Sequence, residues 1–240
     1  MNRINTIKAS LVRLAVILIA ATAFMSCGIG DFSIGEGQTQ RIGKADYENF
    51  LLQGEFLAEE GSQATIAFHD GGDGSGYKVL IHGGPIDGTL KTGSLLHVRN
   101  LYRPLEEDGE WTPLEIAVRG KNISVKVKGE DVVCYTEPDQ PWRLPQYGKM
   151  RLGHGAINVA GEKGKVSFRG LKIERLGADA KNLCDTLPPI DESTDRAIQL
   201  QQEDFPVIDW HVHLKGGLTA EMAHAMSMNY GINYGVAPNA

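Results

Sequence analysis

The sequence lacks three features that would each indicate a familiar class of protein. Only 3 of its 240 residues are cysteines, too few for a fold held together by disulfides. Basic residues do not dominate, since 24 lysines and arginines accompany 30 acidic residues and give a formal net charge of -6. Phosphate contacts require clustered basic side chains, so this balance argues against a nucleic-acid partner. Residues 47–176 also show no convincing helical periodicity, which argues against a helical fold there.

Long apolar runs are scarce as well. The run from Leu14 to Met25 covers about a dozen residues, too short to cross a bilayer core of about 30 Å as a helix. Three basic residues, Arg3, Lys8 and Arg13, precede or begin this segment. A basic start followed by a short apolar run is typical of a secretory signal peptide.

The apolar run ends in the residues 24–28, Phe-Met-Ser-Cys-Gly, which are similar to a bacterial lipobox. We therefore predict a lipoprotein signal peptide over residues 1–26 and lipidation of Cys27. The protein would then be exported and held at the membrane by this lipid, in the periplasm or at the cell surface. An ordinary signal peptide with an incidental cysteine is the alternative. Residues 27–45, rich in Gly, Ser, Gln and Asp, are expected to form a flexible tether.

The sequence does contain a repeated unit, in which a short run of alternating apolar and polar residues is followed by a turn. There are 29 glycines and 10 prolines, which predict many turns. Apolar and polar residues alternate in eight short runs, as in strands with one buried face. The runs are Ala64–His69, Tyr77–His82, Ser94–Val98, Leu114–Val118, Ile123–Val127, Val132–Tyr135, Lys165–Phe168 and Leu171–Leu176. This spacing predicts an all-β fold, a β-sandwich or jelly roll, over residues 46–176.

Five short motifs in this region make the expectation more specific. They are, in order, Gly76-Tyr77-Lys78-Val79, Thr92-Gly93-Ser94-Leu95, Gly109-Glu110-Trp111, Gly153-His154-Gly155 and the segment Val166–Ile173. Together they resemble the 3-keto-disaccharide hydrolase domain, a concanavalin-like sandwich of exported bacterial proteins. The resemblance implies a carbohydrate or glycoside partner, hydrolysis or lyase and hydratase chemistry on keto-sugars, and no cofactor for the sandwich. The alternative is a carbohydrate-binding module without catalysis, joined to a metal-dependent hydrolase.

Five side chains are candidates for contact with a sugar or for proton transfer. His154 lies between two glycines, where it is either a catalytic proton-transfer residue or a hydrogen-bonded structural residue. Trp111 is either a platform for a sugar ring or part of the core. Trp142, between prolines, either binds ligand or holds its loop in place. Tyr77 and His69, at or near the first motif, complete the set of substrate-binding candidates.

Two further features allow more than one interpretation. The acidic, glycine-rich segment Asp70–Gly74 resembles a calcium-binding loop in composition. The spacing of its acidic residues differs from that of an EF-hand and fits a loop between strands. Cys134 and Cys184 are able to pair in an oxidising compartment. A free, buried Cys134 in its strand is the alternative.

The last forty residues differ from the sandwich. Residues 177–204 have the composition of a linker, and residues 205–240 follow a strand-helix-strand pattern. Strand periodicity places Asp209, His211 and His213 on one face of the first strand. Two histidines spaced in this way can bind one metal ion.

The strand-helix-strand pattern resembles the opening of amidohydrolase and polymerase-histidinol-phosphatase-type barrels, whose first strand carries His-x-His. The resemblance implies a divalent metal, zinc or similar, held by His211, His213 and Asp209 if the barrel is complete. A complete barrel takes about 250 residues, and the segment here is about one and a half repeats. We expect this segment to be an incomplete barrel, without its remaining metal ligands.

Overall fold

The computed structural model describes residues 27–85, 87–107, 109–177, 196–205, 207–215, 217–230 and 232–237. The predicted signal peptide, residues 1–26, lies outside this part of the chain. Within the described residues, no helix has the length and apolar character needed to cross a membrane. The regular structure described between residues 27 and 177 is β-strand, apart from the single 3-10 turn Pro145–Tyr147.

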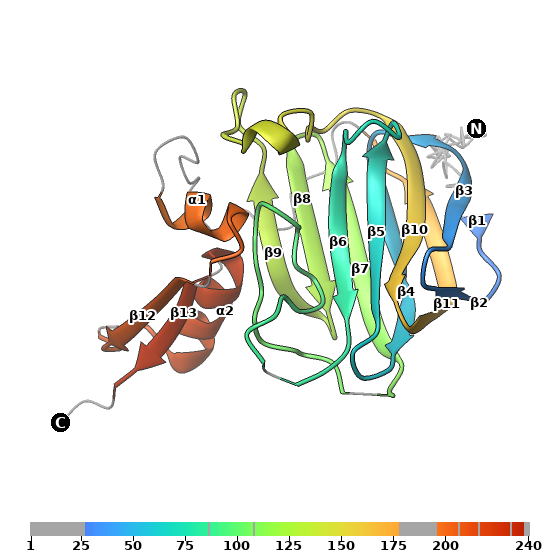
Figure 1. The fold of residues 1–240 in the computed structure, drawn as a ribbon. Coiled ribbons are helices and arrows are strands. Elements are labelled where there is room, and N and C mark those ends of the chain that lie inside the picture. The colour runs from blue at the N-terminus through green and yellow to red at the C-terminus, as the bar shows by residue number, and fades with distance from the viewer. Residues whose placement is uncertain are drawn as a thin grey trace, which may run out of the picture.

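Two antiparallel sheets lie face to face and form a β-sandwich, which confirms the predicted fold class (Figure 1). The larger sheet has seven strands in the order β1-β11-β4-β7-β8-β9, with β2 also paired to β11. Its strands are β1 Cys27–Gly28, β2 Phe32–Gly35, β4 Phe50–Ala58, β7 Thr112–Arg119, β8 Asn122–Val127, β9 Glu130–Thr136 and β11 Lys165–Arg175. The smaller sheet has the order β3-β10-β5-β6. Its strands are β3 Thr39–Tyr47, β5 Gln63–Asp70, β6 Tyr77–His82 and β10 Gly155–Lys163.

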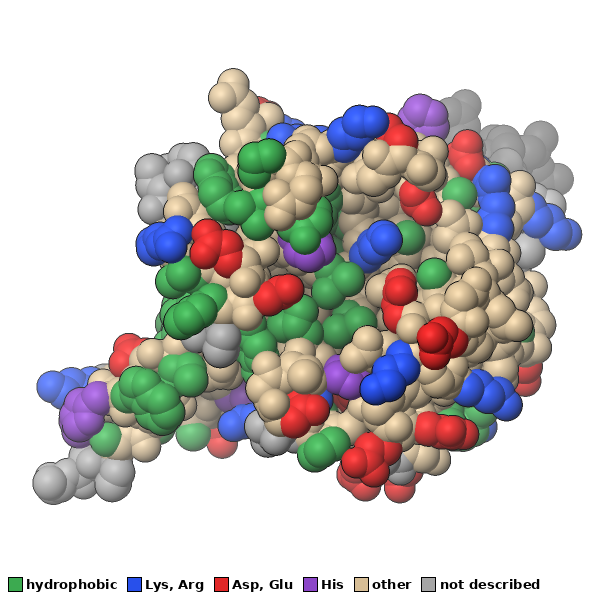
Figure 2. All heavy atoms as spheres, viewed as in Figure 1, with side chains coloured by type: hydrophobic (Ala, Val, Ile, Leu, Met, Phe, Trp, Pro, Cys, Tyr) green, Lys and Arg blue, Asp and Glu red, His purple; other side chains and the backbone are tan. Residues whose placement is uncertain are grey.

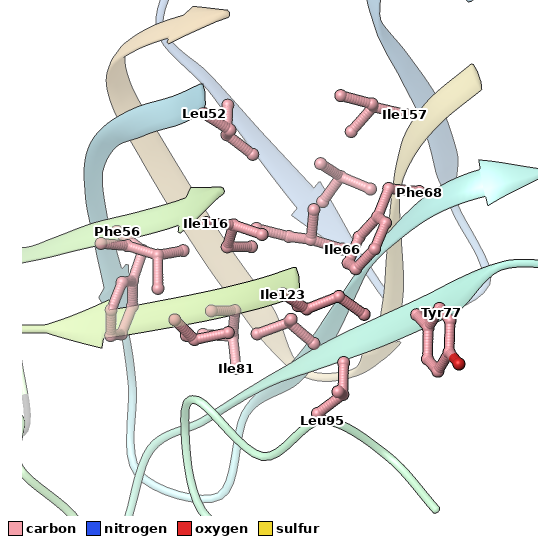
Figure 3. Packing of buried hydrophobic residues seen from close by; sticks show 14 of the residues in the cluster. Leu52, Phe56, Ile66, Phe68, Tyr77, Ile81, Leu95, Ile116, Ile123 and Ile157 are labelled. Carbon is pink, nitrogen blue, oxygen red and sulfur yellow. The ribbon is translucent and has the colours of Figure 1, made fainter. Parts of the chain in front are cut away.

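Alternate side chains of the two sheets fill the space between them. Ile66 and Phe68 of the smaller sheet are fully buried, as are Ile116 and Ile123 of the larger sheet. Figure 3 shows these side chains grouped between the facing strands. Burying one such side chain contributes about 1.5–3 kcal/mol. The alternation predicted for residues 114–118 and 123–127 therefore gives the inner faces correctly.

A long connection, residues 83–111, joins β6 to β7, and its residues 93–96 hydrogen-bond to the edge of β6. The predicted strand Ser94–Val98 lies in this connection and is wrong. Leu95 makes only isolated bridges, to Val79 and Arg99. His97 has φ +63, and this left-handed backbone ends any extended run. The alternation arose here because loop side chains are buried by tertiary packing.

Side-chain contacts hold this connection in one conformation. The Lys91 ammonium, whose side chain is fully buried, donates to Asp87 Oδ1 at 2.8 Å and to Thr89 Oγ1 at 3.0 Å. The hydrogen bonds that Lys91 and Thr89 donate to Asp87 lower the pKa of its carboxyl well below the usual range. Thr92 donates to Glu106 Oε1 at 2.7 Å within the same loop. The loop is therefore an ordered part of the sandwich.

The N-terminal segment 27–45 is not the flexible tether that its composition predicts. It forms β1 and β2, which pair with β11, and most of β3, which pairs with β10. Ile34 and Ile42 are 2% and 1% exposed and belong to the core. The polar, glycine-rich composition concealed these two inward-facing side chains, and their partner strands lie at the far end of the domain sequence.

The C-terminal segment contains a parallel strand-helix-strand unit, as predicted. Strand β12 Val207–Val212 pairs with β13 Ile232–Val236, and helix α2 Ala220–Tyr230 connects them. The unit lies beside β9 at one end of the sandwich (Figure 1). A second helix, α1 Arg196–Gln202, occupies part of the segment 177–204 that was expected to be a linker. Residues 178–195 lie outside the described part of the chain.

Two open alternatives are also decided. Cys134 in β9 is half-buried and disulfide-bonded, so it is not a free buried thiol. The segment Asp70–Gly74 is a loop whose carboxylates accept hydrogen bonds from protein donors, including Lys149 to Asp73 at 2.9 Å. The hydrogen bonds from Ser75 and Lys149 lower the pKa of Asp73 to about 2. Within the described residues, no group of three or more His, Cys, Asp or Glu is arranged to hold a metal ion.

Candidate functional site

The outer face of the smaller sheet carries a groove made of two adjoining hollows of about 460 and 450 Å³. Each volume falls in the range of small-molecule sites. Three residues, Lys78, Leu96 and His97, line both hollows, so the two form one continuous site. Figure 2 shows this face, where hydrophobic, basic, acidic and histidine side chains meet over β5, β6 and the connection that follows β6. We call this site the groove.

Strand alternation decides which residues form the base of the groove. In β6, Tyr77, Val79 and Ile81 point into the core, so Lys78, Leu80 and His82 point outward. The outward residues of the neighbouring strands include Gln63 and Thr65 in β5 and Glu162 in β10. These polar side chains lie side by side because Gln63 pairs with His82, Thr65 pairs with Leu80, and Thr65 also pairs with Ala160 of β10.

Most of the polar groups at the base of the groove already have protein partners. Thr65 Oγ1 donates to Glu162 Oε1 at 3.0 Å. The His82 ring contacts the Leu90 carbonyl through Nδ1 at 2.6 Å and the Gln63 amide through Nε2 at 3.3 Å. Lys78 is exposed and has no ion-pair partner among the described residues. Lys78 is thus the free cation of this part of the groove.

His97 lies where the two hollows join, and three observations single it out. Its backbone is left-handed, with φ +63, a conformation that costs free energy in a residue other than glycine. Its ring stacks on Tyr147 with centroids 3.7 Å apart. Its Nδ1 is buried and has no hydrogen-bond partner among the described residues, whereas the ring hydrogen-bonds to the backbone of Gln202.

The protonation of His97 follows from the same surroundings. Burial lowers the pKa of His97, nearby Asp204 opposes this change, and Lys78 adds to it. With the pKa lowered overall, the imidazole is neutral at neutral pH. A neutral ring that donates through one nitrogen leaves the other nitrogen as an acceptor. His97 therefore carries an unpartnered acceptor nitrogen, Nδ1, which is buried in this conformation.

Two of the predicted substrate-binding residues are buried away from the groove. Tyr77 is 1% exposed, and its hydroxyl donates to Glu137 and accepts from Arg143 Nη2 at 2.9 Å. Burial raises the pKa of Tyr77 well above its ordinary value. His69 is 3% exposed, with Nε2 2.9 Å from the Glu48 carbonyl and Nδ1 accepting from the Gly153 amide at 3.1 Å. Burial lowers the pKa of His69. Neither side chain therefore reaches the groove in this conformation, because strand alternation turns Tyr77 inward and the polar atoms of both side chains have protein partners.

The other three candidates of the sandwich lie outside the groove. His154 is exposed just before β10 and is not among the residues that line either hollow. Trp111 precedes β7 in the opposite sheet, where the Arg169 guanidinium covers its ring at 4.3 Å. Trp142 is half-buried, and its carbonyl accepts from Gln202 Nε2 at 3.3 Å, as expected if it holds its loop in place.

His211 in β12 and His213, directly after this strand, approach each other as the sequence predicts. His211 and His213 are exposed, and their Nε2 atoms are 2.8 Å apart. This is a hydrogen-bond distance, whereas two nitrogens bound to one tetrahedral zinc ion would lie about 3.3 Å apart. The Asp209 carboxylate instead accepts from the His211 backbone amide at 3.2 Å. The described residues thus supply two ligands, and this donor set fits a metal only in part.

Four residues of the groove were not predicted as site residues, and they come from separate segments. They are Lys78 on β6, His97 in the long connection, Glu162 on β10 and Asp204 after α1. The sequence carries only faint signals for them. A connection of the length of residues 83–111 is uncommon unless it has a function.

Comparison with known proteins agrees with the motifs of the sequence. A family model described as 3-keto-alpha-glucoside-1,2-lyase-like domain matches residues 29–174, more than half of the chain. A comparison with curated proteins found no match. Two similar solved structures are provisionally assigned glycosyl hydrolases of Parabacteroides distasonis. They share 15% and 20% identity with this chain, at TM-scores of 0.47 and 0.48.

These structural likenesses are distant. The two hydrolase alignments cover 55% and 61% of this chain and 74% and 87% of the other chains. A carbohydrate binding module of Bacillus subtilis is 12% identical, with a TM-score of 0.41, over 62% of this chain and 94% of that one. Likenesses at this level assign no activity to the groove.

Proposed function

The chain belongs to the family of 3-keto-alpha-glucoside-1,2-lyase-like domains, and from this membership we propose that its groove binds and cleaves a 3-keto-glycoside. The observation that supports the proposal is His97, a neutral imidazole with an unpartnered nitrogen at the junction of the two hollows. A polar groove with one free cation and one available base suits proton abstraction next to a carbonyl.

The chemistry of the ligand explains why one base is enough. A ketone at C3 acidifies the hydrogen on C2, so a base removes this proton and the electron pair forms an enolate. When the carbonyl forms again, a double bond appears between C1 and C2 and the C1–O bond breaks. The leaving oxygen takes a proton, so one glycoside gives one enone and one alcohol. Hydrolysis of the same glycoside would instead add water and give a free keto-sugar.

Each part of the groove has a role in this proposal. Nδ1 of His97 accepts the C2 proton and, as the conjugate acid, supplies a proton to the leaving oxygen. The Lys78 ammonium stabilises the negative charge that develops on the ketone oxygen. Glu162, held by Thr65, accepts a hydrogen bond from a sugar hydroxyl. Because Nδ1 is buried in this conformation, the His97 side chain has to turn toward the ligand on binding.

The direct test uses the full chain and p-nitrophenyl 3-keto-α-glucoside. We expect release of p-nitrophenolate together with the ultraviolet absorbance of a conjugated enone. His97→Gln is expected to lower kcat by about a hundredfold or more, the usual contribution of a general base. The matched variant is His154→Gln, which changes the histidine that the sequence favoured and that lies outside the groove. If His154→Gln alone loses activity, the base is His154 and the present assignment is wrong.

Binding without catalysis is the second candidate. It is favoured by the partners that His82 and Glu162 already have, which leave few groups free to move a proton. It predicts saturable binding of the keto-glycoside in calorimetry, with no nitrophenolate released. Absence of both binding and release would exclude both functions of the groove.

For the C-terminal unit we propose the role that its resemblance implies. His211 and His213 would hold a divalent metal, zinc or similar, in a metal-dependent hydrolase barrel. When bound, such an ion polarises a carbonyl or activates water. Here the two histidines present adjacent nitrogens, and the remaining ligands would have to come from other segments.

Export and lipidation of Cys27 are also proposed. The residues that follow Cys27 are strands of the sandwich, so a lipid there would place the edge formed by β1 and β11 against the membrane surface. Globomycin, which blocks lipoprotein signal cleavage, should cause the precursor to accumulate in cells. Normal processing in its presence would contradict lipidation.

A further inference from the structure

Asp204 lines the groove although it lies thirty residues beyond the segment that the family model matches, which ends at residue 174. It comes immediately after α1, in the part of the chain expected to be a linker. Asp204 and His97 line the same hollow, and the Asp204 carboxylate opposes the lowering of the His97 pKa that burial causes. One wall of the site is thus built by a segment outside the family domain.

Buried amide side chains attach this segment to the sandwich. Gln201 and Gln202 are 0% and 1% exposed. The Asn100 amide N–H donates to Gln201 Oε1 at 3.1 Å, and the Asn100 side chain donates to the Gln201 carbonyl. Gln202 donates to the Trp142 carbonyl at 3.3 Å and hydrogen-bonds to His97 through its backbone. These contacts fix the position of Asp204 relative to His97.

The end of α1 gives an independent reason to ask what Asp204 does. The Phe205 amide donates to the Leu200 carbonyl and the Asp204 amide to the Gln201 carbonyl, both at 3.0 Å. This is the Schellman arrangement, in which the left-handed position is usually glycine. Asp204 occupies that position with φ +56. A carboxylate thus stands where glycine would cost less free energy, and it is exposed to the groove.

We propose that Asp204 is a ligand-contacting, specificity-determining residue of the groove, which accepts hydrogen bonds from the hydroxyl groups of a neutral sugar. This inference rests on the function proposed above and names the residue that selects the sugar. A carboxylate only accepts hydrogen bonds, and two adjacent hydroxyls on a sugar ring provide two donors. Lys78 lines the same hollow and supplies the opposite polarity.

The charges of this hollow define the ligand further. Glu162 and Asp204 are the two carboxylates among its lining residues, and Lys78 is the single permanent cation. Net negative charge disfavours a sugar that carries its own carboxylate. The groove should bind a 3-keto-glucoside more tightly than the corresponding 3-keto-glucuronide. Asp204→Asn should reduce this difference in affinity.

The test compares Asp204→Gly, Asp204→Asn and the control Glu203→Gln in the full chain, with p-nitrophenyl 3-keto-α-glucoside as the probe. Glu203 is the adjacent exposed carboxylate and does not line the groove. Asp204→Gly should weaken probe affinity by roughly tenfold to a hundredfold, as expected for loss of a charged hydrogen bond. Its Tm should stay the same or rise, because glycine adopts the left-handed conformation freely. Glu203→Gln should leave the affinity unchanged.

A titration of His97 by NMR provides a readout that needs no ligand. Asp204→Asn should lower the pKa of His97, because it removes the negative charge that raises it, whereas Glu203→Gln should not. Unchanged probe affinity in Asp204→Gly, whether or not its Tm falls, would overturn the inference. If the unmodified chain neither binds nor cleaves the probe, the proposed function fails. The His97 titration then tests separately whether Asp204 lies close to His97. An unchanged pKa in Asp204→Asn would then overturn that placement.

Discussion

Two glycines of the long connection between β6 and β7 offer a test of how tightly this loop is packed against the core. Gly93 and Gly88 both have left-handed backbones, with φ +91 and +82. They differ in what a methyl group would meet. A Cβ at Gly93 would lie 2.7 Å from a methyl of Val132 and 3.1 Å from one of Val127, whereas a Cβ at Gly88 would have no neighbour within 4 Å.

The magnitudes follow from these surroundings. Alanine at Gly88 bears only the cost of the left-handed backbone, about 1 kcal/mol. Alanine at Gly93 bears that cost and also overpacks the core, which adds about 1–3 kcal/mol. We therefore expect Gly93→Ala to lower the free energy of unfolding by about 2–4 kcal/mol. This is a large fraction of the 5–15 kcal/mol that holds a typical domain together.

The measurement is urea unfolding of the full chain, followed by tryptophan fluorescence. Gly93→Ala should also disturb the groove, because the Gly93 amide donates to the Leu80 carbonyl at 2.9 Å and so attaches the loop to β6. Probe affinity is therefore a second readout, on which Gly88→Ala should have little effect. Equal unfolding free energies for the two variants would refute the argument, since they would mean that the loop moves freely away from the core.

Three further predictions concern residues named above. The pKa of His69 is lowered in the fold, so below about pH 6.5 the unfolded chain binds more protons than the folded chain and the free energy of unfolding falls. His69→Gln should reduce this loss when unfolding is measured as a function of pH. An unchanged pH profile would contradict the prediction. Trp111→Ala should leave probe affinity unchanged, because the ring lies on the opposite sheet under Arg169; a tenfold loss would restore Trp111 as a sugar platform. Any zinc binding by the full chain in calorimetry should be abolished by His213→Ala and retained by Asp209→Asn, because the Asp209 carboxylate faces the His211 amide; equal losses would make Asp209 a ligand.

The strands that could be predicted from the sequence are those whose burial follows a local pattern. The interpretation of Tyr77–His82 as a strand matches β6 at both ends, and β7, β8 and β9 each contain a predicted run. Residues 94–98 mimicked the same pattern, because the loop is buried by contacts with β6. Residues 27–45 showed too little of it, because Ile34 and Ile42 are fully buried while Ile29 and Phe32 are only partly buried against the core. Both errors have one cause, since burial of these segments is decided by distant partners.

The helix α1 was missed for a related reason. Its seven residues, Arg196–Gln202, carry no apolar stripe long enough to predict a helix. Two buried glutamines attach it to the sandwich, although glutamine side chains are mostly exposed in folded proteins. Only the contacts with Asn100 and Trp142 reveal why these amides are buried.

The residues of the candidate site also differ in whether a local sequence pattern predicts them. The alternation that turned Tyr77 into the core also turned Lys78 outward, so the sequence contained enough information to place Lys78 in the groove and to exclude Tyr77. The same argument places Glu162 outward, because Ile157 and Val159 of β10 point inward. His97 and Asp204 obey no such period, since each lies in a left-handed turn.

Among the residues other than glycine that line the groove, His97 and Asp204 have left-handed backbones, with φ +63 and +56, and His69 and Lys128 share this conformation outside the groove. Unfavourable backbone persists where surrounding contacts enforce it, and such residues concentrate at functional sites. In this molecule the enforcing contacts are the stacking of His97 on Tyr147 and the attachment of α1 through Gln201 and Gln202. The base of the groove is thus set by local alternation, and its two most distinctive side chains are set by contacts between segments 50 or more residues apart, which no local pattern records.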